Sequence, residues 1–244
     1  MKTTFLFILF IFLIGCTSEN NQSANSLSDF IKADYSHYQS IVSCELLHEK
    51  NLSSVERFIP ILVTQLDKVR DNNDEVKFFF PIESENNSVS SFKILLNHQD
   101  ETLIDDMRIS LSDIPFKETA LCNIEDSIYG GLSLYETNLE STLTIIEIMD
   151  CNYLNNFNYA TMKLVFEEFT DALRKLDPNI SISYSENLKN NSQFRWFNVF
   201  DSIDDRKTFV EDWQDLSISN PIQDLFIEQS SCGISSLYKS YKVI

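Results

Sequence analysis

Apolar residues recur at helical spacing in two segments of the chain that lie 107 positions apart. In each segment they step by four, three, four and three residues, which places five side chains on one face of a helix. Cysteines at the same distance before each segment, Cys44 and Cys151, share this offset. The aligned positions are Val55, Ile59, Leu62, Leu66 and Val69 in the first segment, and Met162, Phe166, Phe169, Leu173 and Leu176 in the second. We therefore predict two amphipathic helices within an internal duplication.

The correspondence continues beyond these helices with small changes of offset, as loops of unequal length require. The β-forming run 92–95 matches the aromatic run 194–197 at an offset of 102, and Cys122 matches Cys232 at an offset of 110. In both halves glycine and then a β-rich run follow the second cysteine. The pattern indicates two copies of one structural unit.

Each copy has the predicted element order β-α-β-β-α-β, which is the split βαβ arrangement of an α+β protein. In the first copy we expect strands at 40–47, 76–80, 92–96 and 132–136, a helix at 52–69 that Pro60 bends, and helical structure over 102–126. In the second copy we expect strands at 143–149, 180–184, 194–200 and 236–243, and helices at 159–176, 204–215 and 221–228.

The N-terminal segment has a different pattern. Lys2 precedes an apolar run at 5–14 that ends at Gly15 and Cys16. A basic start, a short apolar run and a small residue before a cleavage point are typical of a secretory signal, and the run is shorter than the roughly 18 to 20 residues of a spanning helix. The polar stretch 17–26 has no large apolar residue, so we expect it to form a flexible tether.

The tetrapeptide Leu13-Ile14-Gly15-Cys16 resembles the lipobox of bacterial lipoprotein signal peptides. The resemblance implies cleavage before Cys16, lipidation of that cysteine and anchorage to a membrane of the cell envelope. Thr17 in place of aspartate favours, by the same resemblance, the outer membrane facing the periplasm in a Gram-negative host. A plain cleaved signal and an uncleaved anchor are the alternatives. We expect a signal peptide at 1–15, a lipidated cysteine and tether at 16–30, and α+β repeats at 31–138 and 139–244.

Element order and the aromatic third strand give residues 36–244 a resemblance to the ferredoxin-like dimeric α+β barrel group. In that group two such units close their sheets into one barrel. The resemblance implies that this chain supplies both units as tandem ferredoxin-like repeats, and so forms an intrachain pseudo-dimeric α+β barrel in a monomer. A different two-layer α+β fold is the alternative.

Four cysteines remain once Cys16 is set apart, and four cysteines allow three disulfide pairings. Export would place them where disulfides persist. In a split βαβ unit the first and last strands are antiparallel neighbours, which favours pairing within each repeat: Cys44 with Cys122, and Cys151 with Cys232. A metal or redox site is the less favoured alternative, because there is no CxxC and no histidine at ligand spacing from a cysteine.

Charge and composition exclude several classes of function. The net charge of −18 opposes binding to nucleic acid and to anionic headgroups. The sequence has no GxSxG elbow and no GxGxxG or Walker loop, so we expect no cofactor and no metal. The three histidines, His37, His48 and His98, are scattered through the first repeat. We interpret them as surface or packing residues.

The third strand of each repeat is the candidate binding site. Alternate strand residues point to opposite faces, so Phe194, Trp196 and Asn198 share one face. If that face borders a cavity between the sheets, these residues with Ile94 and Leu96 line a pocket for an apolar or aromatic ligand; the alternative is a filled core. The favoured function is a non-catalytic envelope lipoprotein that binds a small molecule or a partner protein. The alternative is a barrel enzyme, oxygenase-like or lyase-like, acting on a small apolar or aromatic substrate.

Overall fold

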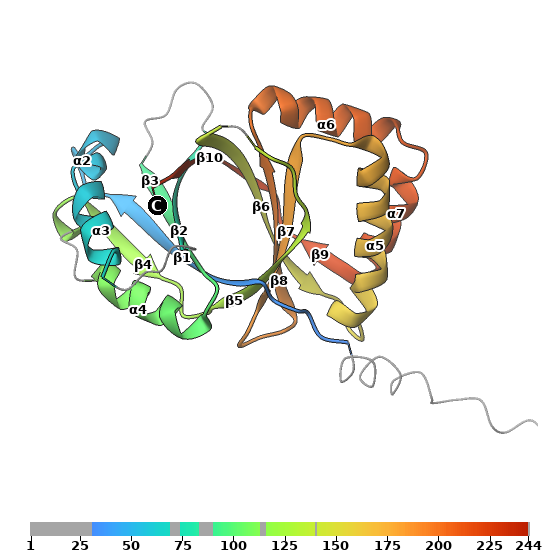
Figure 1. Ribbon diagram of the computed structural model, residues 1–244, viewed down its shortest axis with the longest axis horizontal. Helices are drawn as coiled ribbons and strands as arrows, with labels where there is room; N and C mark the ends of the chain where they lie inside the picture. The colour runs from blue at the N-terminus through green and yellow to red at the C-terminus, as the bar shows by residue number, and fades with distance from the viewer. Residues whose placement is uncertain (1–30, 69–73, 83–89, 113–115, 140, 244) are drawn as a thin grey trace, which may run out of the picture.

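The computed structural model describes residues 31–68, 74–82, 90–112, 116–139 and 141–243 (Figure 1). The first repeat contains β1 (His37–Leu46), α2 (Leu52–Glu56), α3 (Ile59–Leu66), β2 (Glu75–Pro81), β3 (Ser91–His98), α4 (Glu101–Ser112), η1 (Phe116–Glu118), β4 (Ala120–Ile124) and β5 (Tyr129–Tyr135). The second contains β6 (Leu143–Tyr153), α5 (Tyr159–Leu176), β7 (Ile180–Asn187), β8 (Gln193–Phe200), α6 (Ile203–Asp215), α7 (Ser219–Gln229), β9 (Ser230–Cys232) and β10 (Ser236–Lys242). The expected signal peptide, Cys16 and Thr17 lie outside the described residues.

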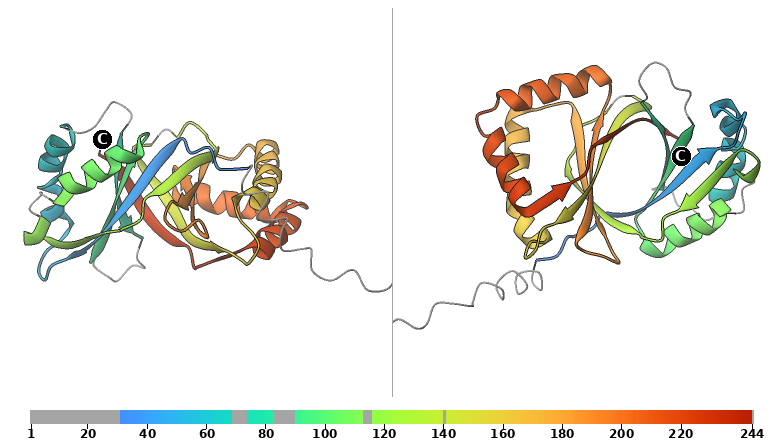
Figure 2. Two further views of the ribbon diagram at one scale, coloured as in Figure 1. Left: turned by 90° about the horizontal axis from the view of Figure 1, so that it is seen from below. Right: turned by 180° about the vertical axis from the view of Figure 1, so that it is seen from behind.

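Eight antiparallel strands close into a barrel in the order β10–β2–β3–β1–β5–β7–β8–β6, and β6 returns to β10. The last strand of each repeat pairs on one side with the first strand of its own repeat and on the other with the second strand of the other repeat, as β5–β7 and β10–β2. The helices cover the outside of the barrel, α2 to α4 over one half and α5 to α7 over the other (Figures 1 and 2). The predicted fold class, two ferredoxin-like units joined in one α+β barrel, is confirmed.

The long helix of the second repeat has the predicted bounds. Its apolar stripe packs on the sheet, and the Asn158 side chain caps its start by accepting from the backbone N–H groups of Ala160 and Thr161. Asp177, in the left-handed region at φ 48°, ends it just before Pro178. No helix in the described ranges is both long enough and apolar enough to cross a membrane.

The matching helix of the first repeat is two short helices, α2 and α3. Pro60 lies in the first turn of α3, where its missing N–H and fixed φ are tolerated. The chain therefore breaks at Arg57 and Phe58, just before the proline, instead of bending at it. The apolar stripe survives the break, because Val55, Leu62 and Leu66 are all buried.

Apolar residues are buried on both faces of the barrel sheet. One cluster lies under the helices of each repeat. A third, which we call the barrel plug, fills the middle of the barrel and comprises Ile41, Phe79, Leu95, Ile146, Ile148, Phe197 and Tyr238. The plug joins residues of both repeats, so the two units share one core.

Two disulfides fasten short strands to the outside of the ring. Cys44–Cys122 joins β1 to β4, and Cys151–Cys232 joins β6 to β9, which is the pairing expected within each repeat. Of the helical structure predicted over 102–126, α4 and the short 3-10 helix η1 are present, and the prediction was wrong from Ala120 on, since 120–124 form strand β4. This strand pairs with β1 opposite Cys44, so tertiary pairing decides its conformation.

Candidate functional site

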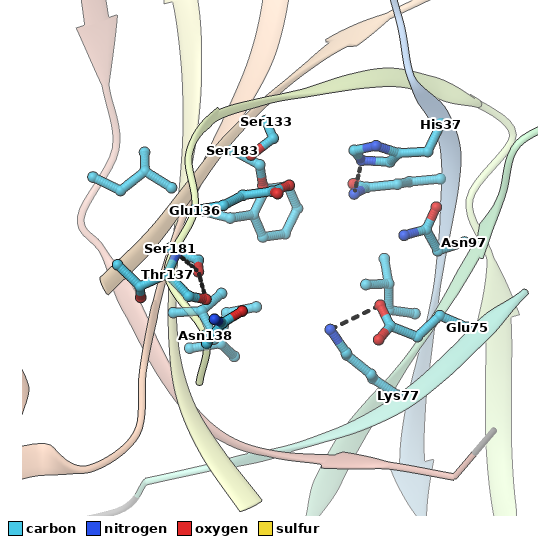
Figure 3. Close-up of a pocket in the computed structure, with 16 residues that line it drawn as sticks. His37, Glu75, Lys77, Asn97, Ser133, Glu136, Thr137, Asn138, Ser181 and Ser183 are labelled. Carbon is cyan, nitrogen blue, oxygen red and sulfur yellow. Dashed lines mark hydrogen bonds and ion pairs between the residues drawn. The ribbon is translucent and has the colours of Figure 1, made fainter. Parts of the chain in front are cut away.

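A cavity of about 660 Å³ occupies one mouth of the barrel, above the plug (Figure 3). Strands β1, β2 and β3 supply one wall and β5, β7 and the segment after β5 supply the other. The labelled polar lining residues are His37, Glu75, Lys77, Asn97, Ser133, Glu136, Thr137, Asn138, Ser181 and Ser183. We call this cavity the mouth pocket.

The mouth pocket is polar around its walls and apolar at its floor. Leu95, Ile146 and Phe197 of the plug form that floor, with Val199 beside them. Hydroxyl and amide groups, which both donate and accept hydrogen bonds, supply most of the polar lining. The arrangement suits a small molecule with one apolar side and several hydrogen-bonding groups.

The imidazole of His37 faces the pocket from the start of β1 (Figure 3). It lies on the backbone of β5 at Gly131, where an added Cβ would be 2.2 Å from Nε2, so any other residue there would displace the ring. Burial lowers the pKa of His37, with Glu75 opposing and Lys77 reinforcing that effect, so the ring is neutral at pH 7. Both ring nitrogens have neighbours: Gln39 Nε2 is 2.8 Å from His37 Nε2, and Ser36 Oγ is 3.0 Å from Nδ1.

The hydrogen-bond network assigns the direction of the Gln39 contact. Ser185 Oγ donates to Gln39 Oε1 at 3.0 Å, so the amide NH₂ of Gln39 faces His37 and donates to Nε2. The lone pair that a general base would use is therefore occupied. In this state His37 is held in place by Gln39 and forms part of the polar wall of the pocket.

Glu75 is the second ionisable group of the pocket and is held in an ion pair from two sides. Lys77 Nζ lies 2.8 Å from one of its carboxylate oxygens and Lys242 Nζ lies 3.2 Å from the other. Burial raises the pKa of Glu75, but the two ammonium groups outweigh it and hold the pKa below its ordinary value. Lys242 belongs to β10, so both repeats complete the charge balance of this wall.

The structure corrects the five residues predicted to line a pocket. Phe194, Trp196 and Asn198 face the helices, as do Ile94 and Leu96 in the first repeat, and none of the five lines the mouth pocket. Trp196 packs on rings of α5 and α7, and its Nε1–H donates to Asn198 Oδ1 at 2.8 Å. The alternate residues, Phe197 and Val199, border the pocket instead.

The histidines separate into three environments. His48 is exposed, whereas His98 is buried with its Nε2 2.8 Å from Asp74 Oδ1, so both fit the surface-or-packing interpretation. His37 does not, because it lines the mouth pocket. In the sequence, the only signal for this placement was that His37 and Gln39, two positions apart, lie on the same face at the start of a strand. Across the described ranges, no three His, Cys, Asp or Glu side chains are placed to hold a metal ion.

The opposite mouth of the barrel contains a buried arginine and a second cavity. Arg195 donates to Glu125 at 2.8 and 2.9 Å and to Asp150 at 2.7 Å, and its guanidinium lies 4.2 Å from the centre of the Tyr129 ring. Burial lowers its pKa, but these carboxylates outweigh burial and raise the pKa above its ordinary value. A cavity of about 520 Å³ lies nearby, and it shares no lining residue with the mouth pocket.

Comparison with known proteins supports the fold alone. No family model and no curated protein sequence matches the chain. Among solved structures, it is similar to a mutant chlorite dismutase from Candidatus Nitrospira defluvii, with a TM-score of 0.58, 8% identity, and 86% of this chain and 94% of that chain covered. It is also similar to the putative monooxygenase of Fusobacterium nucleatum, with a TM-score of 0.57, 9% identity, and coverage of 87% and 94%. The chain thus has the duplicated barrel fold of these proteins.

Proposed function

We propose that this protein is a lipid-anchored protein of the cell envelope whose mouth pocket binds a small polar molecule without chemically changing it. The observation that carries the proposal is the pairing of His37 and Glu75, the partly buried ionisable groups opposite Glu136, which is exposed. Glu75 is neutralised by Lys77 and Lys242, and the Nε2 lone pair of His37 is occupied by Gln39. The remaining wall of hydroxyl and amide groups is suited to holding a ligand.

The lining defines the class of ligand. An uncharged molecule with several hydroxyl or amide groups would match the polar walls, and one apolar face would rest on Leu95, Ile146 and Phe197. A volume of about 660 Å³ lies within the range of ligand sites, roughly 300 to 1,000 Å³. The pocket thus differs from the apolar or aromatic site that the sequence predicts.

The proposed location rests on two features that are independent of the pocket. The tetrapeptide ending at Cys16 resembles a lipobox, and two disulfides suit a compartment where thiols are oxidised. Labelled palmitate fed to cells expressing the full chain should be incorporated into the wild type and lost in Cys16→Ser. Equal labelling of both proteins would contradict the anchor, whatever the pocket binds.

The ligand is tested by screening uncharged hydroxylated and amide-bearing compounds for a shift in melting temperature. Compounds that stabilise the wild type should fail to stabilise Ser183→Leu, because a larger side chain on β7 fills the pocket. Ser231→Leu, an exposed serine of β9, is the matched control and should respond like the wild type. A compound that stabilises all three proteins equally binds elsewhere and contradicts the proposal.

An enzyme is the second candidate, because His37, Glu75 and Lys77 all line one cavity. The structural relatives are described as chlorite dismutase and monooxygenase, but at 7 to 9% identity those descriptions apply to the relatives. An enzyme would require Gln39 to release His37 when substrate binds. His37→Gln would then abolish turnover of a ligand found in the screen while leaving its binding intact, whereas the binding proposal expects no turnover in either protein.

A further inference from the structure

We propose that the second cavity, at the opposite mouth of the barrel, is a binding site for a small organic carboxylate held by Lys93. This cavity of about 520 Å³ is lined in part by Lys93, Ser43, Asn123 and Tyr238. It is separate from the mouth pocket and does not depend on what that pocket binds. We call it the Lys93 cavity.

The duplication supplies an internal reference for this site. On the first strand of each repeat, Ser43 lies opposite Lys93 and Asp150 lies opposite Arg195 in the same register. Each cation also lies over a tyrosine of a last strand: Lys93 Nζ is 5.5 Å from the centre of the Tyr238 ring, and Arg195 is 4.2 Å from that of Tyr129. The two sites are therefore structural equivalents.

The site of Arg195 shows how the positive charge at this strand position can be neutralised by the protein itself. Arg195 is bound by two carboxylates, those of Asp150 and Glu125. On β1 Ser43 stands in the place of Asp150. Ser235, which the offset of the second cysteines aligns with Glu125, does not line the Lys93 cavity and hydrogen-bonds Glu147 instead. The Lys93 cavity thus has no carboxylate in the place of Asp150 or of Glu125, and Lys93 remains where its structural equivalent, Arg195, has two anionic partners.

The contacts of Lys93 agree with this difference. Its side chain is half-buried, and within the described part of the chain its ammonium forms no ion pair and no hydrogen bond, only the contact with Tyr238. The cavity walls also carry Ser43, Ser91 and Asn123, whose side chains make no hydrogen bond in the same part of the structure. A partly desolvated ammonium gains most from an anionic partner that also satisfies neighbouring donors. A bound carboxylate would take the place that Asp150 has beside Arg195.

The surrounding charge selects the type of anion. Glu45 lines the same cavity with an exposed carboxylate, and the chain as a whole carries a net charge of −18. Both repel a phosphate dianion more than a carboxylate monoanion. The Tyr238 ring and Pro81 provide apolar walls for the rest of the molecule. These features favour a monocarboxylate with an apolar or aromatic body.

Titration of the full-length protein with benzoate tests the site, with benzyl alcohol as the uncharged analogue. Calorimetry should show saturable benzoate binding, and binding to Lys93→Met should be weaker by at least about tenfold, equivalent to roughly 1.4 kcal/mol. Lys93→Arg should retain binding, and Lys175→Met, which removes an exposed lysine of α5, should bind like the wild type. Unchanged benzoate affinity in Lys93→Met, or no saturable binding to the wild type, would overturn the proposal.

A second pair of variants tests the site by copying the carboxylate that Asp150 supplies to Arg195. Ser43→Asp should supply the missing carboxylate to Lys93 and weaken benzoate binding by at least about tenfold, whereas the isosteric Ser43→Asn should change it by less than about threefold. Equal effects of Asp and Asn would mean that size, not charge, controls the cavity, and would contradict the proposal. Stronger competition by inorganic phosphate than by acetate would overturn the choice of a carboxylate.

Discussion

The two repeats share a strand order but fill the space between sheet and helices with different side chains. In the second repeat Trp196 contacts the rings of Phe166, Phe169 and Phe226 under one continuous helix. In the first repeat the matching position is Ile94, within a mainly aliphatic cluster under broken helices. The comparison teaches that register and connectivity, rather than side-chain identity, define this fold.

The largest losses of stability in both repeats should appear when these core residues are truncated. Trp196→Ala should lower the free energy of unfolding by about 4 kcal/mol, and Ile94→Ala by about 3 kcal/mol, because the larger side chain leaves the larger cavity. Urea denaturation of both variants measures the difference. A smaller loss for Trp196→Ala than for Ile94→Ala would show that the aromatic cluster collapses into the space.

The two disulfides should contribute equally to stability, so in this respect the repeats should behave alike. They close loops of nearly equal length, with separations of 78 and 81 residues. Replacing either pair by alanine should therefore cost about 3 kcal/mol, and the two losses should agree within about 0.5 kcal/mol. Denaturant unfolding of the two double variants tests this. Strongly unequal losses would mean that local packing, not loop closure, dominates.

The cations at the second mouth should respond unequally to the same substitution. Arg195→Met leaves Glu125 and Asp150 without their partner, and since both are partly exposed the loss of stability should be about 2 kcal/mol. Lys93→Met removes only a contact with Tyr238 and should change stability by less than about 0.5 kcal/mol. Thermal unfolding at low and high salt measures both. Equal losses would contradict the idea that Lys93 lacks a protein partner.

The smallest expected effect concerns a carboxylate present in one repeat alone. Glu186 accepts from Tyr35 at 2.9 Å on the outer face of β7, at the register position that Phe80 occupies in β2. Burial raises the pKa of Glu186 above its ordinary 4.5, and hydrogen bonds from Tyr35 and Tyr184 only partly oppose this. The unfolded chain therefore ionises first as the pH rises, and stability falls between pH 4.5 and the raised pKa.

Comparison with Glu186→Gln isolates that effect from the other carboxylates. The difference in free energy of unfolding between the variant and the wild type should increase in favour of the variant as the pH rises through this window, then level off. Urea denaturation at a series of pH values from about 4 to 8 measures it. A constant difference would mean that Glu186 has the same pKa in both states.

The spacing of apolar residues predicted the helix at 159–176, the order of the elements and the alignment of the two repeats. It could not predict strand β4, because residues 120–124 form a strand only by pairing with β1. Nor could it show that the helix over 52–69 breaks before Pro60, since both parts keep the same apolar stripe.

The sequence also could not show which face of a barrel strand points into the barrel. Trp196 is 5% exposed and its neighbour Phe197 is 2% exposed, because helices cover one side and the plug fills the other. Alternation separates the two sets of side chains but does not say which set faces inward. The mouth pocket draws His37, Glu75, Ser133 and Ser181 from four strands, and only closure of the barrel brings them together.

The last strand of each repeat pairs with the second strand of the other, β5 with β7 and β10 with β2. Each half therefore has sheet edges whose backbone hydrogen bonds are satisfied only by the other half. A homodimer with this architecture would carry every substitution twice, at both symmetry-related places. Fusion into one polypeptide removes that constraint, so a residue can change on one side while its counterpart is conserved. Lys93 and Arg195 are such a pair: equivalent places in the two halves of one chain carry different cations and different partners.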